Sequence, residues 1–178
     1  MVARLVPVQA LGAAHPYPLI RGGGAFLICV GTGLLLGWLL PRLWKPFAIG
    51  SGVAGLAAIG LSLVLPSLGR PSPAHLMALV GAVAVELGLI YLIVVTLRGR
   101  DERTLTLAML FAVGLHLAIM GLAFGPLIAI LGLLTSTNAG AALRFRMIPL
   151  QLAGAVDAVL KIAFGVWMFA FHPAFTYA

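Results

Sequence analysis

Residues 150–171 have the sequence LQLAGAVDAVLKIAFGVWMFAF, an apolar stretch with two opposite charges near its middle. Its length matches the roughly 20 apolar residues that a helix needs to cross a hydrocarbon core of about 30 Å. Asp157 and Lys161 are four positions apart, acid first, which places them on one helical face in the favourable order. Because a charge at the bilayer centre costs about 2.5–3.5 kcal/mol on insertion scales, such residues usually face protein or water. The stretch therefore predicts a transmembrane helix with a sheltered ion pair.

The composition of the whole chain also indicates a membrane protein. Of its 178 residues, 62% are hydrophobic and 8% are charged, and the mean hydropathy is +1.17. In ordinary soluble domains about a quarter of the residues are charged. The net charge of +7 comes from basic residues near the predicted helix ends, which is typical of membrane loops and gives no basic stripe for nucleic acid. We expect an all-α, polytopic helix bundle in the lipid bilayer, with no cofactor, no metal site and no nucleic-acid partner.

Proline, glycine and charged segments divide the chain into six predicted spans. The apolar run over residues 105–144 is about 60 Å long as a helix, too long for one crossing, and Phe124-Gly125-Pro126 interrupts it. Ser72-Pro73 predicts the start of the third span, and Thr104 is a candidate cap for the fourth. The predicted spans are residues 19–40, 47–65, 74–97, 105–123, 126–142 and 150–171, in one bundle between an interfacial N-terminal leader, residues 1–18, and a short tail, residues 172–178.

The fifth span is short and polar, so a re-entrant half-helix is an alternative that leaves five true spans. The basic residues distinguish the two topologies. With six spans, seven basic residues share one side and three lie on the other, whereas five spans divide them five to five when Lys161 is left out. Because cytoplasmic loops carry an excess of Lys and Arg, we predict six spans in a bacterial inner membrane, with both termini on the outer side.

Polar residues in four different spans fall at similar depths. At a rise of 1.5 Å per residue, all lie within several ångströms of the bilayer centre, Lys161 somewhat toward the outer side. Because a buried ionisable group must be neutral, paired or in contact with water, we expect these residues to converge on one binding or proton-relay site. The predicted site residues are Glu86, His116, Asn138, Asp157 and Lys161.

Structural roles are open for each of these residues. For Asp157 and Lys161 the alternative is a static pair that fixes helix packing. His116 suits a hydrogen-bonded core position, and Asn138 suits contact between helices. Glu86 has no partner one turn away, so it must be protonated, face water, or meet His116 or Lys161 across helices.

Two short segments indicate an internal repeat. Ala84-Val85-Glu86 and Ala155-Val156-Asp157 each place an acid in the middle of the third span of a half. Two halves of three spans have opposite orientations, the inverted-repeat plan of transporters that bind at the midplane. The similarity covers only a few residues, and superposition of the two halves tests the repeat.

The buried polar groups favour a small permease or channel-like protein for a proton or a small polar solute. The alternative is a non-catalytic accessory or scaffold subunit of a larger membrane complex, because the loops are short and no soluble domain is present. In either case we expect a homo-oligomer or a partner membrane subunit. An intramembrane enzyme is the least favoured class, because no paired-acid or nucleophile–base motif occurs and no catalytic residue is predicted.

Overall fold

The computed structural model describes residues 17–64 and 71–170. These residues form six long helices and one short 3₁₀ turn, with no strand among them. The predicted leader, apart from Tyr17 and Pro18, and the predicted tail lie outside the described residues. The elements are α1 (Ile20–Leu39), η2 (Pro41–Leu43), α2 (Trp44–Val64), α3 (Pro73–Thr96), α4 (Glu102–Phe124), α5 (Pro126–Arg144) and α6 (Leu150–Ala170).

All six helices are long and apolar enough to span a membrane, so the prediction of an all-α membrane bundle with six helices is confirmed. The length of α5 favours six spans over the re-entrant alternative. It is a continuous helix of 19 residues, which at 1.5 Å per residue gives about 28 Å, close to the thickness of the hydrocarbon core.

Local sequence determines where two of the helices begin. At the start of α3, Ser72 Oγ accepts a hydrogen bond from the His75 N–H at 3.3 Å, while the Ser72 N–H donates to His75 Nδ1 at 3.2 Å, a capping box followed by Pro73. At the start of α4, Asp101 Oδ2 accepts from the Thr104 N–H at 3.1 Å. The prediction that Thr104 caps α4 is therefore wrong. Asp101 is preferred because its carboxylate satisfies a free helix N–H and interacts favourably with the helix dipole.

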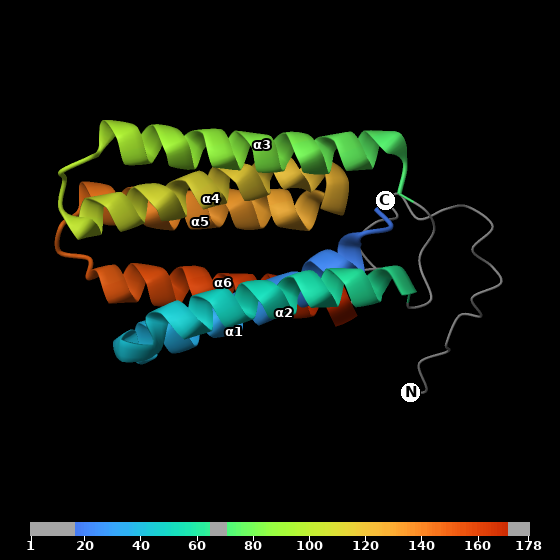
Figure 1. Ribbon diagram of the computed structural model, residues 1–178, viewed down its shortest axis with the longest axis horizontal. Helices are drawn as coiled ribbons and strands as arrows, with labels where there is room; N and C mark the ends of the chain where they lie inside the picture. The colour runs from blue at the N-terminus through green and yellow to red at the C-terminus, as the bar shows by residue number, and fades with distance from the viewer. Residues whose placement is uncertain (1–16, 65–70, 171–178) are drawn as a thin grey trace.

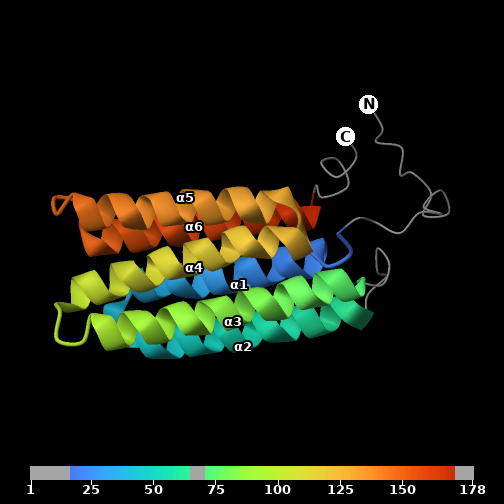
Figure 2. The same cartoon turned by 90° about the horizontal axis from the view of Figure 1, so that it is seen from above.

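The helices form two layers of three. Figure 1 shows α3, α4 and α5 in one layer and α2, α1 and α6 in the other, and Figure 2 shows the same order from above. Within each layer the middle helix contacts both neighbours: α4 packs against α3 and α5, and α1 packs against α2 and α6. Contacts between α5 and α6 join the layers along one side.

Close approach of the helices depends on glycine. A Cβ atom on Gly132 of α5 would lie 2.6 Å from the Gly114 carbonyl oxygen of α4. A Cβ atom on Gly24 of α1 would lie 2.8 Å from the Gly165 carbonyl oxygen of α6. Since no Cβ atom fits at such distances, these helix pairs are packed backbone to backbone, as small residues permit in membrane proteins.

The contacts between the first three helices and the last three are partly symmetric. The third helix of each half packs against the first helix of the other half, since α3 lies on α4 and α6 lies on α1. Consecutive helices run in opposite directions in Figure 1, so each helix of the first half runs antiparallel to the corresponding helix of the second half. The contact between α5 and α6 has no equally extensive counterpart between α2 and α3. Superposition of the halves stays a prediction.

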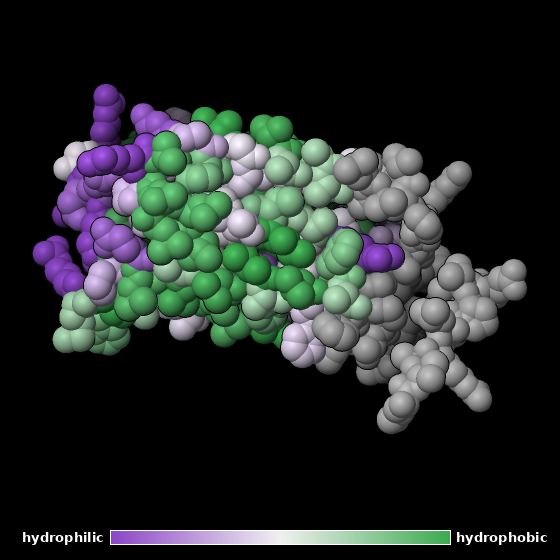
Figure 3. Space-filling view, turned by 90° about the horizontal axis from the view of Figure 1, so that it is seen from below, coloured by the Kyte–Doolittle hydropathy of each residue, from purple (hydrophilic) through white to green (hydrophobic). Residues whose placement is uncertain are grey.

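One end of the bundle is strongly basic. The connections α1–α2, α3–α4 and α5–α6 lie together at this end, and the surface there is hydrophilic, next to a broad apolar band (Figures 1 and 3). The apolar band is the surface that contacts the lipid bilayer. The basic residues in these connections and at the adjoining helix ends are Arg42, Lys45, Arg98, Arg100, Arg103, Arg144 and Arg146.

Candidate functional site

The most deeply buried charges are the two on α6. Lys161 Nζ donates a hydrogen bond to Asp157 Oδ2, and the side chains are only 3% and 1% exposed. The other carboxylate oxygen, Asp157 Oδ1, is buried and has no hydrogen-bond partner. The pair forms because residues four apart on a helix are neighbours. It is neutral as a whole, but one of its acceptors is unsatisfied.

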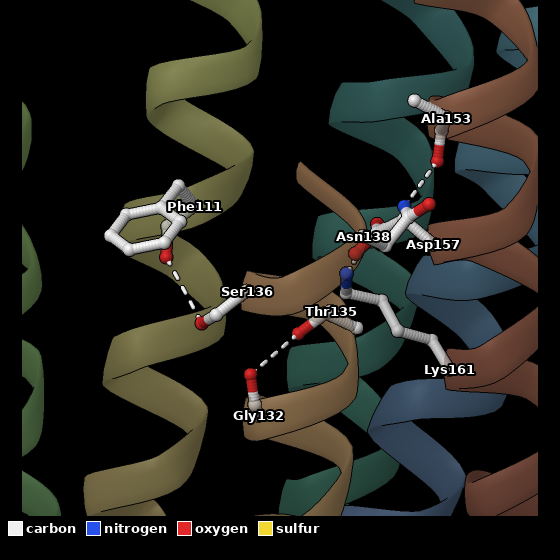
Figure 4. A network of polar contacts seen from close by, with 8 residues as sticks. All are labelled: Phe111, Gly132, Thr135, Ser136, Asn138, Ala153, Asp157 and Lys161. Atoms are coloured by element: carbon white, nitrogen blue, oxygen red, sulfur yellow. Dashed lines mark hydrogen bonds and ion pairs between the residues drawn. The ribbon is translucent and has the colours of Figure 1, made fainter. Parts of the chain in front are cut away.

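Polar residues of α5 lie beside this pair. Figure 4 shows Thr135 and Asn138 on the α5 ribbon next to Asp157 and Lys161 on α6. Asn138 Nδ2 donates to the Ala153 carbonyl oxygen at 2.8 Å, which ties α5 to α6 one turn before Asp157. Thr135 is fully buried, and its hydroxyl donates to the Gly132 carbonyl oxygen of its own helix at 3.2 Å. The α5–α6 contact therefore encloses an acid, an ammonium, a hydroxyl and an amide.

A second ionisable pair joins α3 and α4. Glu86 Oε2 lies 3.4 Å from His116 Nδ1, with the side chains 24% and 8% exposed. Both ring nitrogens of His116 are buried and lack a hydrogen bond of good geometry. Glu86 therefore meets His116 across helices, one of the two partners expected for it from the sequence.

Contacts between neighbouring helices place the two pairs at similar depth. His116 lies two residues after Gly114, which packs against the backbone of Ser136 on α5. On the same helix, Asn138 bonds to a carbonyl oxygen of α6 one turn before Asp157. The chain of contacts thus crosses α3, α4, α5 and α6 at one level of the bundle, with the two pairs at its two ends.

The predicted site residues form two groups. Asn138, Asp157 and Lys161 meet where α5 and α6 pack together, whereas Glu86 and His116 meet where α3 and α4 pack together. Among the described residues, no hydrogen bond or ion pair joins the two groups directly. Their functional role stays a prediction.

Thr135 belongs with the first group, although the sequence distinguished it only as part of a polar stretch. Its position three residues before Asn138 places both on the same face of α5, and this spacing was the available signal. The complete burial of Thr135 results from the packing of α5 between α4 and α6, which helical periodicity alone does not give.

A family model of proteins of unknown function, DUF6609, matches residues 12–177, nearly the whole chain. The chain belongs to this family. No curated protein and no solved structure matches it. Membership of this family identifies neither an activity nor a substrate. The buried groups can exchange protons, at the carboxylates, the imidazole and the amine, and can bind a small polar or cationic solute through oxygen atoms.

Proposed function

We propose that the protein is a small permease or channel-like protein that moves protons or a small polar solute across the membrane. The observation that carries this proposal is the presence of two ionisable pairs at one depth of the bundle, each with buried polar atoms that lack hydrogen bonds. Ionisable groups are costly in a membrane, and where they occur they commonly mark ion pathways and proton relays.

The unsatisfied atoms define where a proton or solute would bind. Asp157 Oδ1 is a free acceptor, and the two His116 ring nitrogens provide a donor and an acceptor in the neutral ring. An unsatisfied buried polar group costs about 1–3 kcal/mol, so binding of a water molecule or a polar solute at these atoms is favoured.

The two pairs differ in accessibility, which suggests different roles. Glu86 is the more exposed group, so protons that reach this pair bind Glu86 first and pass to His116. Asp157 and Lys161 are buried within the bundle. For a solute to move past them, their ion pair must separate or the ammonium must be replaced by another cation. Under the positive-inside rule the basic end of the bundle faces the cytoplasm. The first residue of α1 and the last residue of α6 then lie on the outer side of a bacterial inner membrane.

Flux measurements in liposomes test the proposal. The purified protein is reconstituted, and proton movement is followed with an internal pH dye under an imposed gradient. Glu86→Gln and Asp157→Asn are expected to reduce flux at least tenfold. Glu102→Gln is the matched control, because it makes the same chemical change at an exposed acid in the first turn of α4. Wild-type flux in both midplane variants would overturn the relay.

A second candidate is an accessory or scaffold subunit, favoured by the outer helices α2 and α3. Each packs mainly against one neighbour and leaves a long apolar face uncovered, with Ile49, Val53 and Leu56 exposed on α2 and Met77 and Val80 exposed on α3. Exposed glycines on the same helices would permit close approach of another helix.

Purification from native membranes in a mild detergent separates the two functions. A scaffold is expected to bring a membrane partner in fixed stoichiometry, and substitution of Val53 or Val80 by Trp is expected to release it. A homogeneous species that contains only this chain and supports flux in liposomes would exclude the scaffold function.

A further inference from the structure

The partner of the Asp157 carboxylate is the ammonium group of Lys161, a small cation that is covalently attached to the same helix. Lys161 carries a primary ammonium at the end of a four-carbon stem, and the structure places this ammonium on Oδ2 of the carboxylate. The pair is almost completely enclosed, with Thr135 and Asn138 of α5 beside it (Figure 4). The surroundings of Asp157 therefore already accommodate one ammonium group, that of Lys161.

The site can change its occupant only if its charge stays balanced. Asp157 and Lys161 are neutral together, and a net charge at this depth costs several kcal/mol. A free cation that binds Asp157 restores neutrality only if Lys161 gives up one proton. Protonation of Asp157 alone would instead leave the ammonium unpaired in the bundle. Exchange of a cation for a proton is thus the reaction that avoids a buried net charge.

We propose that Asp157 is a binding site for a small ammonium-type cation, such as ammonium or methylammonium, and that Lys161 is its tethered competitor. This inference rests on the proposed transport function and names the class of solute. The cation enters as a protonated amine and binds the carboxylate. The Nζ–H bond of Lys161 breaks, its proton leaves to solvent, and Lys161 remains as a neutral amine. The charge of the site is the same before and after.

Among the described residues of the helices that contact α6, no other ionisable side chain contacts the Asp157–Lys161 pair. Between its first residue and Arg144, α5 contributes only uncharged polar groups, including Thr135 and Asn138. On α1, which packs against the other side of α6, the ionisable residues are Arg21 and Cys29, and the Arg21 guanidinium lies over the Phe169 ring, two turns beyond Lys161. On α4 the only ionisable residue in the interior of the helix is His116, which pairs with Glu86.

Removal of the tethered amine provides the first test. In Lys161→Ala, the space of the lysine side chain is free and Asp157 lacks its cation, so methylammonium chloride is expected to stabilise the purified, full-length variant. At ten times its Kd, a ligand specific for the folded state raises the melting temperature of a chain of this size by about 3–6 °C. Asp157→Asn/Lys161→Ala is the matched control and is expected not to respond.

The choice of salt tests the class of cation. Sodium chloride at the same concentration is expected to leave the melting temperature of Lys161→Ala within about 1 °C of its value without ligand. An equal response to both salts would overturn the ammonium assignment, and an equal response of the double variant would overturn the site.

Proton release from the wild-type protein is the second test, which holds even where Lys161→Ala does not fold. Addition of methylammonium chloride to the protein in weakly buffered detergent solution at pH 8 is expected to release up to one proton per chain, seen with a pH dye. Asp157→Asn is expected to release none. If wild-type protein releases no proton while Glu86-dependent flux persists in liposomes, the cation site is wrong and the transport function stands. If flux is absent but proton release occurs, the site stands and the transport function is wrong.

Discussion

Glu86 of α3 and His116 of α4 face each other across two helices, with 3.4 Å between Oε2 and Nδ1. The contact ties a weakly held outer helix to the centre of the bundle, because α3 packs mainly against α4. A Glu86 carboxylate and a protonated His116 imidazole attract each other, and a proton bound by the pair can move between Oε2 and Nδ1.

We expect this pair to be energetically coupled. Glu86→Gln and His116→Gln each remove one partner, and the double variant removes both. Because Glu86 Oε2 lies 3.4 Å from His116 Nδ1, the coupling energy is expected within the range for residues in contact, about 0.5–3 kcal/mol. Thermal unfolding of the four proteins in detergent gives this value, and strictly additive single effects would contradict it.

The pair on α6 is expected to behave differently, because both of its members are buried. Asp157→Asn or Lys161→Met leaves one charge without its partner, which costs about 3–5 kcal/mol. Asp157→Asn/Lys161→Met removes both charges and is expected to recover most of that loss. The free energies of unfolding of the single and double variants measure the effect. A double variant as unstable as the two single changes added together would show that the pair is not one unit.

Hydropathy was sufficient to predict the membrane class, and the break at Phe124-Gly125-Pro126 together with the distribution of basic residues predicted six helices. The Asp157–Lys161 pair also followed from sequence, because the spacing of four residues within one helix determines the contact without knowledge of any neighbour. The contact between Glu86 and His116 was one of several possibilities, since its formation depends on α3 lying against α4.

Helix order was the part that sequence did not determine. The apolar faces of all six helices pack equally well against lipid and against other helices. The periodicity of apolar residues therefore does not reveal that α1 and α4 are the central helices of the two layers. Consequently the equal depths of Asn138 and His116 were predicted, while their separation into two groups was not. The start of α4 was missed for a local reason, because Asp101 and Thr104 are both good capping residues and three positions apart.

Backbone-to-backbone packing between α4 and α5 gives a further prediction. A methyl group on Gly132 would lie 2.6 Å from the Gly114 carbonyl oxygen, and backbone cannot move aside as a flexible side chain does. Gly132→Ala is therefore expected to lower the free energy of unfolding by about 1–3 kcal/mol. Gly88→Ala is the control, since nothing lies within 4 Å of a Cβ there, and it is expected to be neutral or slightly stabilising. The melting temperatures of both variants measure the difference.

Arg103 is expected to hold the basic end of the bundle together. Its guanidinium Nη2 donates to the Ala142 carbonyl oxygen at 2.7 Å and to the Ile148 carbonyl oxygen at 2.8 Å. The first acceptor is one of the last carbonyls of α5, which have no partner within the helix. Arg103→Gln is expected to loosen the α5–α6 connection, so that trypsin cleaves after Arg144 or Arg146 several times faster than in the wild-type protein. The exposed Arg98→Gln is the control, and equal cleavage in the two variants would contradict the bridge.

The stability of the first turn of α4 is expected to decrease at acidic pH. Hydrogen bonds from the Thr104 hydroxyl, at 2.8 Å, and from the Thr104 N–H lower the pKa of Asp101 below its usual value near 3.8. Because the pKa is lowered in the folded protein, the contribution of this cap is complete above the unfolded-state value of about 3.9 and is lost as the pH falls through the lower, folded-state value. Hydrogen exchange of the amides in the first turn of α4, corrected for the intrinsic exchange rate, is therefore expected to accelerate only below about pH 4. Asp101→Asn retains a capping side chain that does not titrate, so its protection is expected to be the same on both sides of this range. If Asp101→Asn lost protection over the same pH range, another acid would be responsible, and the exposed Glu102 in the first turn of α4 would be the next residue to substitute.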